Sequence, residues 1–324
     1  MRRQFIILMF VATTTLLACA GEEATSRLVT KPSPRLSGPV SLSLQNEINA
    51  AVDRGRTWLI SQQNADGSFG TISYRQPDYM WRTNVDYRIE FTSVATLALL
   101  HNATSNELAA ATKAANWLAK ENIISLAKEN AAFTEETEEW RKLALLTAGV
   151  PDQYVPPTNS VRSPITPIIG PNPFCGMLCR EVRHQPASTN RTVSPKSSVL
   201  YQCLIGMPTT PTPITPTGAN ALSLLANSWP NPLDATNKCQ NVQYSRACQY
   251  WIFARFINRA GGGTLADAQG KIVDWRNDLA QKMVDSQTSA TGGKGGFWQD
   301  ADAKSWTGQP IAATAFALLA LDEL

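Results

Sequence analysis

The chain has 324 residues, 17% of them charged, and a formal net charge of +3 at pH 7. This small excess of positive charge excludes a polybasic surface, so nucleic acid is not an expected partner. Beyond the N-terminus, no continuous apolar run reaches the roughly eighteen residues that a membrane-spanning helix requires. Roughly 280 residues follow the N-terminal segments, which suffices for one large domain or two small ones with a sizeable core.

The first residues have the pattern of a bacterial export signal. Arg2 and Arg3 form a positively charged start, and Phe5 to Leu17 form an apolar run too short to span a bilayer. The run ends in Leu-Leu-Ala-Cys, which resembles the lipobox of bacterial lipoproteins and implies that Cys19 is lipidated. The alternative is an ordinary cleaved signal followed by a chance cysteine. Acyl chains on Cys19 would anchor the protein, because each buried methylene contributes about 0.8 kcal/mol.

Three segments follow from these patterns: a signal peptide over 1–18, a lipidated cysteine with a flexible stalk over 19–42, and a helical domain over 43–324. The stalk is rich in Ser, Thr and Pro and poor in aliphatic residues, which is typical of a linker. Ala20 stands where an Asp marks inner-membrane retention in Gram-negative lipoproteins. The resemblance therefore implies the bacterial cell envelope, and the outer membrane if the organism is Gram-negative.

The first predicted elements of the domain are two helices joined by a turn. Residues 43–63 carry apolar or small side chains at steps of three and four, including Ile48, Trp58 and Leu59, which predicts an amphipathic helix. Asn-Ala-Asp-Gly-Ser-Phe-Gly follows, and its Asp-Gly step is a strong turn signal. Residues 92–100 are apolar on nearly every side, which predicts a fully buried helix.

The Tyr-rich connection between these helices, residues 74–90, holds candidate functional residues. Asp78, Asp86 and Glu90 are candidate catalytic carboxylates, because glycosidases place two carboxyl groups around the bond that they cleave. Aromatic and arginine side chains are typical of binding surfaces, and the loop offers four candidate ligand contacts: Tyr79, Trp81, Arg82 and Tyr87. The alternative is a loop that packs its aromatic residues over the rim of the domain.

The middle of the chain has little helical periodicity and an unusual composition. Residues 151–217 contain thirteen of the twenty prolines. A loop of this length inside a compact domain is typically functional or disordered. Cysteines in the same region favour an ordered loop held by disulfides, since an exported chain meets an oxidising compartment.

Five cysteines remain in the body of the chain, so at least one stays out of an internal pair. The simplest assignment joins neighbours in sequence, Cys175 with Cys179 and Cys239 with Cys248, and leaves Cys203 unassigned. The alternative is a zinc site made by Cys175, Cys179, Cys203 and His184. Its spacing fits no zinc template, so we expect no metal and no cofactor.

The two-part helical unit returns at the C-terminus. Residues 277–287 are amphipathic, and residues 309–321 are apolar throughout, with Pro310 where a first helical turn tolerates proline. Further helices are predicted over three ranges: 107–120, 135–148 and 243–258. Strand patterns are scarce, so the predicted fold class is all-α.

Residues 54–69 resemble the QW repeat of the terpenoid-cyclase and prenyltransferase superfamily. Four residues have the spacing of the motif, which usually ends in Trp rather than Phe: Trp58, Gln63, Gly67 and Phe69. Three residues repeat its tail near the C-terminus: Gln287, Gly296 and Trp298. The resemblance implies an α/α toroid, in which outer helices pack around inner helices and each Gln caps a neighbouring helix end. We expect a single ring, closed or incomplete, interrupted by the Pro- and Cys-rich loop.

The chemistry of that superfamily is not encoded in the matching residues. Class II terpene cyclases protonate an alkene with an Asp-x-Asp-Asp-Thr-Ala motif at the start of an inner helix. The matching stretch keeps Thr314 and Ala315, while Pro310, Ala312 and Ala313 replace the acids. A thioester of the complement type would need Cys-Gly-Glu-Gln, which the chain lacks.

Two functions are left open by these observations. The first is a lipid-anchored envelope protein that uses its toroid as a binding or structural module, with a hydrophobic or glycan ligand and a membrane as partners. The alternative is an envelope enzyme acting on a glycan or an isoprenoid lipid. Asp300 and Asp302, in the polar turn before the last helix, are further candidate carboxylates for that enzyme, with a solvated turn as the other interpretation.

Overall fold

The computed structural model describes residues 40–71, 87–120, 131–150, 245–260, 269–293, 295–300 and 306–324, with short pieces at 219, 222–223, 225–227 and 265–266. In these ranges the chain is helical apart from turns, isolated bridges and one antiparallel hairpin of β1 (Thr288–Ser289) and β2 (Gly296–Phe297), so the all-α prediction is confirmed. The α-helices are α2 (Leu42–Ser61), α3 (Arg88–Leu100), α4 (Ser105–Leu118), α5 (Ala131–Thr147), α10 (Arg246–Ala260), α11 (Trp275–Asp285) and α12 (Pro310–Asp322). None of these helices has the length and apolarity needed to cross a bilayer.

Helix α2 is favoured by a capped N-terminus and by an apolar stripe along one face. The Ser41 hydroxyl accepts a hydrogen bond from the Leu44 amide at 3.4 Å and so caps the N-terminus. Its buried positions recur at steps of three and four, and they include Ile48, Gly55 and Trp58. Most of the remaining positions are exposed, which places α2 on the outside of the molecule.

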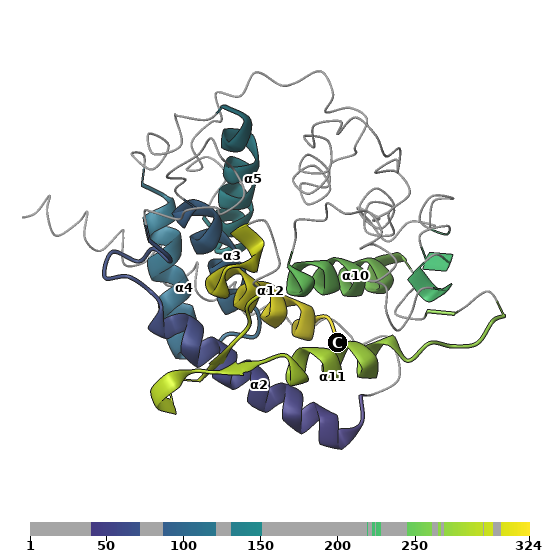
Figure 1. Ribbon diagram of the computed structural model, residues 1–324. Coiled ribbons are helices and arrows are strands. Elements are labelled where there is room, and N and C mark those ends of the chain that lie inside the picture. Colours follow the sequence, from purple (N-terminus) through teal and green to yellow (C-terminus); the bar gives the residue numbers. More distant parts are fainter. Residues whose placement is uncertain are drawn as a thin grey trace, which may run out of the picture.

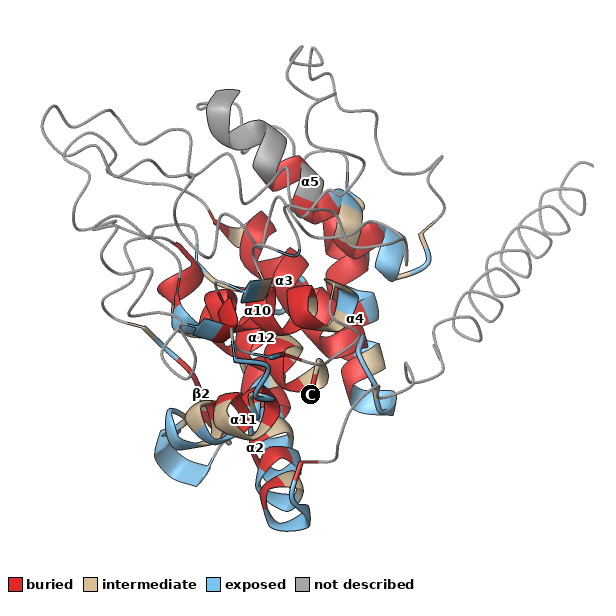
Figure 2. Cartoon of the chain, turned by 90° about the vertical axis from the view of Figure 1, so that its right-hand side faces the viewer, coloured by how far each residue is buried: buried red, intermediate tan, exposed pale blue. Residues whose placement is uncertain are grey.

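Two helices, α3 and α12, are buried on nearly all sides because they are apolar around their whole circumference. Helix α3 begins at Arg88, earlier than predicted, since Ile89, Glu90 and Phe91 are buried as part of the helix. Helix α12 begins at Pro310, where a missing N–H group costs no intrahelical hydrogen bond. Figure 2 shows both helices largely in red, while α2 and α4 carry pale blue outer faces.

The helices pack in two layers. Helices α10, α12, α3 and α5 are successive neighbours in an inner layer, and α11, α2 and α4 lie outside them (Figure 1). Helix α12 packs on α3 and α11 packs on α2, so the C-terminal helix pair lies directly beside the N-terminal pair. A ring would have to close through residues 151–244, most of which lie outside the described ranges, and the toroid therefore stays a prediction.

The turns that follow α2 and α11 each hold another outer helix through a glutamine side chain, an arrangement that we call the glutamine clamp. Gln63 Nε2 donates to the Ala110 carbonyl of α4 at 2.9 Å, and Gln287 Nε2 donates to the Ala51 carbonyl of α2 at 2.8 Å. The expectation that these glutamines cap helix ends is wrong, because both carbonyls lie within their helices. A carbonyl inside a helix keeps a second lone pair, and a small alanine side chain leaves it accessible.

A glycine lets each turn approach the helix that it clamps. Gly67 has a φ of 101°, and a Cβ there would lie 2.5 Å from the Lys113 carbonyl oxygen of α4. Gly295 has a φ of 91°, and a Cβ there would overlap the Arg54 carbonyl oxygen of α2. Gly296, which the sequence pairs with Gly67, instead lies against the clamp glutamine. Gly295 is the structural counterpart of Gly67. In the longer C-terminal turn, the glycine closest to the helix backbone lies one residue earlier than the sequence comparison suggests.

A threonine on α3 and another on α12 complete the repeated unit. Thr92 Oγ1 accepts a hydrogen bond from the Phe69 amide at 2.9 Å, and Thr314 Oγ1 accepts one from the Trp298 amide at 3.0 Å. Thr92 and Thr314 occupy the same position counted from the starts of α3 and α12. The α2–α3 and α11–α12 pairs are therefore two copies of one structural unit.

Replacing Gly295 by alanine tests the close approach. We expect Gly295→Ala to lower the free energy of unfolding by about 2 to 4 kcal/mol, through a left-handed backbone and a steric overlap with α2. Gly292→Ala is the matched control, since Gly292 has a φ of 76° and nothing within 4 Å of its Cβ position. The control should cost only about 1 kcal/mol. Urea unfolding measures both, and equal losses would contradict the clamp.

Candidate functional site

Most of the candidate residues lie outside the described ranges, and their roles stay predictions. They are Cys19, Asp78, Tyr79, Trp81, Arg82, Asp86, Cys175, Cys179, His184, Cys203, Cys239 and Asp302. Four candidates are described, and they do not form one cluster: Tyr87, Glu90, Cys248 and Asp300.

Three of the described candidates lie in the core or at a helix end. Tyr87, a candidate ligand contact, is 1% exposed at the start of α3 and packs in the core. Asp300 Oδ2 accepts a hydrogen bond from the Arg246 amide at 2.9 Å and thereby caps the start of α10. Cys248 is buried in α10, while its expected partner Cys239 is outside the described ranges, so their pairing stays a prediction.

Glu90 has the most distinctive position of the described carboxylates. It lies two residues before Thr92 in α3, and Ala312 has the same place before Thr314 in α12. Ala312 replaces the middle acid of the cyclase motif, so Glu90 occupies the equivalent place on the neighbouring inner helix. Its carboxyl group is buried, and Thr137 Oγ1 of α5 donates to Glu90 Oε1 at 2.5 Å.

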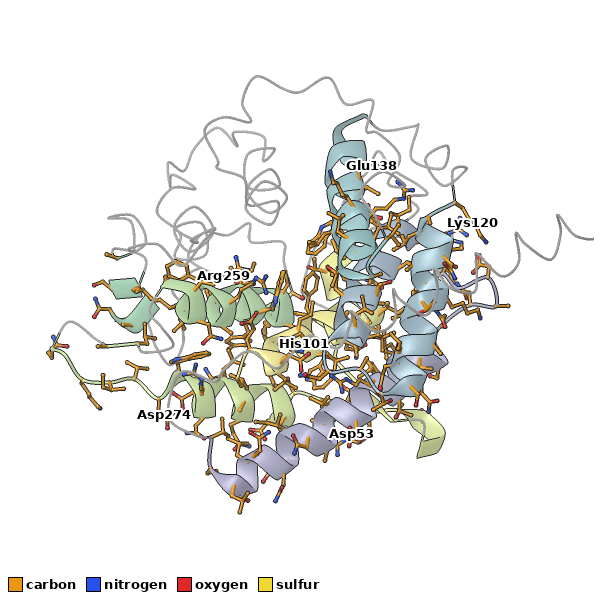
Figure 3. All side chains as sticks on the ribbon, turned by 180° about the vertical axis from the view of Figure 1, so that it is seen from behind. Asp53, His101, Lys120, Glu138, Arg259 and Asp274 are labelled. Carbon is orange, nitrogen blue, oxygen red and sulfur yellow. The ribbon has the colours of Figure 1, made fainter. Side chains whose placement is uncertain are left out.

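Two charged side chains of α5, Glu138 and Arg141, follow Thr137 in the sequence and pair with each other. Arg141 is fully buried, and its Nη1 lies 3.1 Å from Glu138 Oε2. Arg141 Nε also donates to the Leu118 carbonyl, at the end of α4, at 2.7 Å. Removing one partner of such a buried pair leaves the other charge unpaired and costs about 3 to 5 kcal/mol. These bonds fix α5, on which Figure 3 labels Glu138, to the end of α4.

An aromatic cluster fills the space between the inner helices beside this polar group. Its four members come from α5, α10, the 3-10 turn Trp306–Gly308 and α12, and they are Trp140, Trp251, Trp306 and Phe316. Neighbouring ring centroids lie 5.4 to 6.3 Å apart, which is the contact distance of packed aromatic side chains. The four side chains are 0 to 3% exposed, so this part of the interior is packed rather than open.

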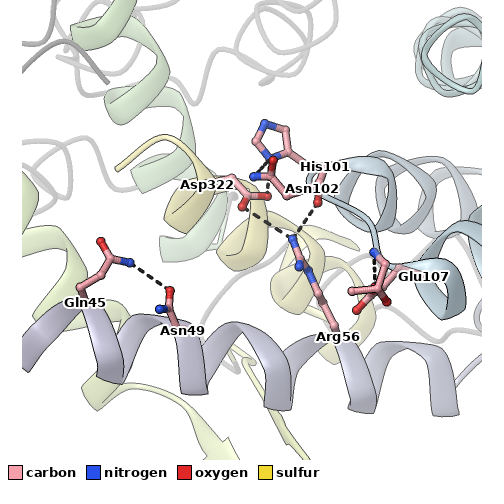
Figure 4. Close-up of polar contacts among 8 residues, drawn as sticks. Gln45, Asn49, Arg56, His101, Asn102, Glu107 and Asp322 are labelled. Atoms are coloured by element: carbon pink, nitrogen blue, oxygen red, sulfur yellow. Dashed lines mark hydrogen bonds and ion pairs between the residues drawn. The ribbon is translucent and has the colours of Figure 1, made fainter. Parts of the chain in front are cut away.

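A second polar cluster joins α2, α3 and α12 (Figure 4). Arg56 Nη2 donates to the His101 carbonyl at 2.7 Å and lies 3.8 Å from Asp322 Oδ1. His101 Nδ1 lies 3.0 Å from Asp322 Oδ2. The hydrogen bond with Asp322 raises the pKa of His101 against the opposing effect of burial. The sequence has no local signal for this cluster, because its members come from three distant segments.

The described residues offer no group of three His, Cys, Asp or Glu side chains arranged to hold a metal ion. Around α5 they offer the buried carboxyl group of Glu90, the Arg141–Glu138 ion pair and a set of packed aromatic rings. This arrangement stabilises the contacts among α3, α4 and α5.

The family model of the A-macroglobulin TED domain matches residues 43–136. The match spans α2, the first glutamine clamp, α3, α4 and the start of α5, and that family is an α/α-toroid-like helical domain. The likeness shown is thus to a toroid-like helical domain, and the resemblance to terpenoid cyclases stays a prediction. The matched segment contains no cysteine, so no thioester can form within it. The search of curated proteins found no match.

Titration of His101 tests the second polar cluster. Because the pKa of His101 is raised above its ordinary 6.5, its ion pair with Asp322 stabilises the fold fully below pH 6.5 and is lost as the pH rises through the raised value. The imidazole is half exposed, so we expect a contribution of about 1 kcal/mol or less. Thermal unfolding of wild type and His101→Gln, from below pH 6.5 to above the raised pKa of His101, measures this contribution. The wild type should lose its advantage at high pH, and a constant difference would contradict the pair.

Proposed function

We propose that the protein is a lipid-anchored protein of the bacterial cell envelope whose helical domain works by binding rather than by catalysis. The anchor is supported by the sequence before the domain: two arginines, an apolar run and the Leu-Leu-Ala-Cys stretch that ends at Cys19. The stalk over 19–42 would hold the domain away from the membrane surface.

The packed aromatic cluster is the observation that carries the binding function. An enzyme that encloses an apolar substrate within a toroid needs an open interior, whereas Trp140, Trp251 and Phe316 touch one another there. At the start of α12, Pro310 and Ala312 take the places of the cyclase acids. Both features favour ligand contact at the outer surface of the domain.

The second candidate is an envelope enzyme that acts on a glycan or an isoprenoid lipid. The place of Glu90 on α3 favours it, because a buried carboxyl group at the start of an inner helix is where the resembling family keeps its acid. The hydrogen bond from Thr137 and the packing of α5 over this carboxyl group favour a structural role instead.

Replacing Cys19 tests the anchor. We expect Cys19→Ala to move the protein from the membrane fraction to the soluble fraction, because the acyl chains supply nearly all of the membrane affinity. Mass spectrometry of the wild type should find an acylated N-terminal peptide that begins at Cys19. Ser26→Ala in the stalk is the control and should stay with the membrane. An unmodified Cys19, or a variant that remains membrane-bound, would contradict the anchor.

Replacing the candidate carboxylates separates binding from catalysis. We expect Glu90→Gln, Asp86→Asn, Asp300→Asn and Asp302→Asn each to restore the phenotype of a deletion strain as well as wild type does, since the binding function needs none of them as an acid. Glu90→Gln keeps an oxygen acceptor for Thr137, so its fold should persist. Asp53→Asn on the exposed face of α2 is the control. A folded variant that fails to complement would support the enzyme.

A further inference from the structure

The C-terminal clamp turn is longer than the clamp itself requires. Five residues more lie between Gln287 and Trp298 than between Gln63 and Phe69. Both turns nevertheless make the same bond to an outer helix and the same bond to a threonine of an inner helix. The additional residues are therefore not needed for these two bonds.

These residues build one wall of a surface groove. They form the hairpin of β1 and β2 with a 3-10 turn, Thr291–Gly293, at its tip. The hairpin brings Phe297 onto Trp58 of α2, with ring centroids 4.9 Å apart and an angle of 24° between the rings. Beside this stacked pair lies a groove of about 340 Å³, which we call the Trp58 groove. Its lining includes Trp58, Gln62, Ala290, Thr291, Phe297 and Gln299.

The groove combines an aromatic surface with uncharged polar groups. Phe297 is partly exposed, and the described lining residues carry no charge. Gln299 and Thr291 are exposed at the edges, and the Gln62 amide lies beside them with Ser61 as a hydrogen-bond acceptor at 3.0 Å. Gly292 and Gly293, in the 3-10 turn of the hairpin, have nothing within 4 Å of their Cβ positions.

This combination selects the chemistry of a ligand. A charged molecule would lose hydration without meeting an opposite charge among the described lining residues. A purely apolar molecule would cover the exposed Gln299 amide without giving it a partner, which costs free energy. A neutral sugar satisfies both demands, because its C–H face packs on an aromatic ring while its hydroxyl groups bond to amides and to a threonine.

We propose that the Trp58 groove binds a neutral oligosaccharide. The inference rests on the proposed binding function and gives it a ligand class. Phe297 supplies the stacking surface, and Gln62, Gln299 and Thr291 supply hydrogen bonds along its edges. Trp58 supports Phe297 from below and is itself part of the core at 8% exposure.

Ligand-detected NMR with the full-length protein in detergent tests the proposal. The probes are maltotriose, cellotriose and the trimer of N-acetylglucosamine, with trigalacturonate and farnesol as charged and apolar comparators. We expect at least one neutral trisaccharide to bind and both comparators to fail. Phe297→Ala should weaken binding about tenfold through loss of the stacking surface. Gln299→Ala, a change at an exposed position, should weaken binding about threefold without affecting the fold.

Asn106→Ala is the matched control, because Asn106 lines the separate groove between α2 and α4. It should leave binding unchanged. No binding of any neutral trisaccharide, or tighter binding of trigalacturonate or farnesol, would overturn the ligand class. Trisaccharide binding that both groove variants leave unchanged would overturn the site. Neither result touches the proposed anchor, which fails if Cys19 is unmodified or if Cys19→Ala stays in the membrane fraction.

Discussion

The hydrogen bond from a glutamine amide to a carbonyl inside a helix is the contact on which this architecture depends. It occurs twice with the same geometry, from Gln63 to α4 and from Gln287 to α2. In each case a glycine with positive φ removes the side chain that would hold the turn away from the helix backbone. The second clamp also joins residues 236 positions apart, because it links the turn after α11 back to α2. The α11–α12 pair therefore lies beside the α2–α3 pair, and its clamp holds α2 in the way that the clamp after α2 holds α4.

This arrangement explains why α3 and α12 have so few polar groups. Once the outer layer is clamped, α3 and α12 touch neighbours on nearly every side, and an apolar circumference is the cheapest way to meet them. Several of the polar groups that remain inside have partners: Thr92 and Thr314 accept hydrogen bonds from the turns, and Arg141 pairs with Glu138. The aromatic cluster then fills the space between the inner helices.

The two clamp turns show how one packing solution leaves room for different functions. The turn after α2 passes from Gln63 to Phe69 in a few residues, whereas the longer turn after α11 adds a hairpin between Gln287 and Trp298. Both satisfy the same hydrogen bonds, so the hairpin can vary without loss of the fold. A packed interior and a surface elaborated at one turn are consistent with a domain that meets its ligand from outside.

The sequence by itself determined the helical class, the paired units and the positions of most helices, because helical periodicity and turn residues act over short distances. It identified Gln63, Gly67, Gln287 and Trp298 as repeated residues, yet not what they contact. The carbonyl partners, the role of Gly295 and the Arg56, His101 and Asp322 cluster were decided only in the tertiary structure. Each of these depends on backbone atoms or side chains brought together from distant segments, and a carbonyl group, present in every residue, leaves no mark in a sequence.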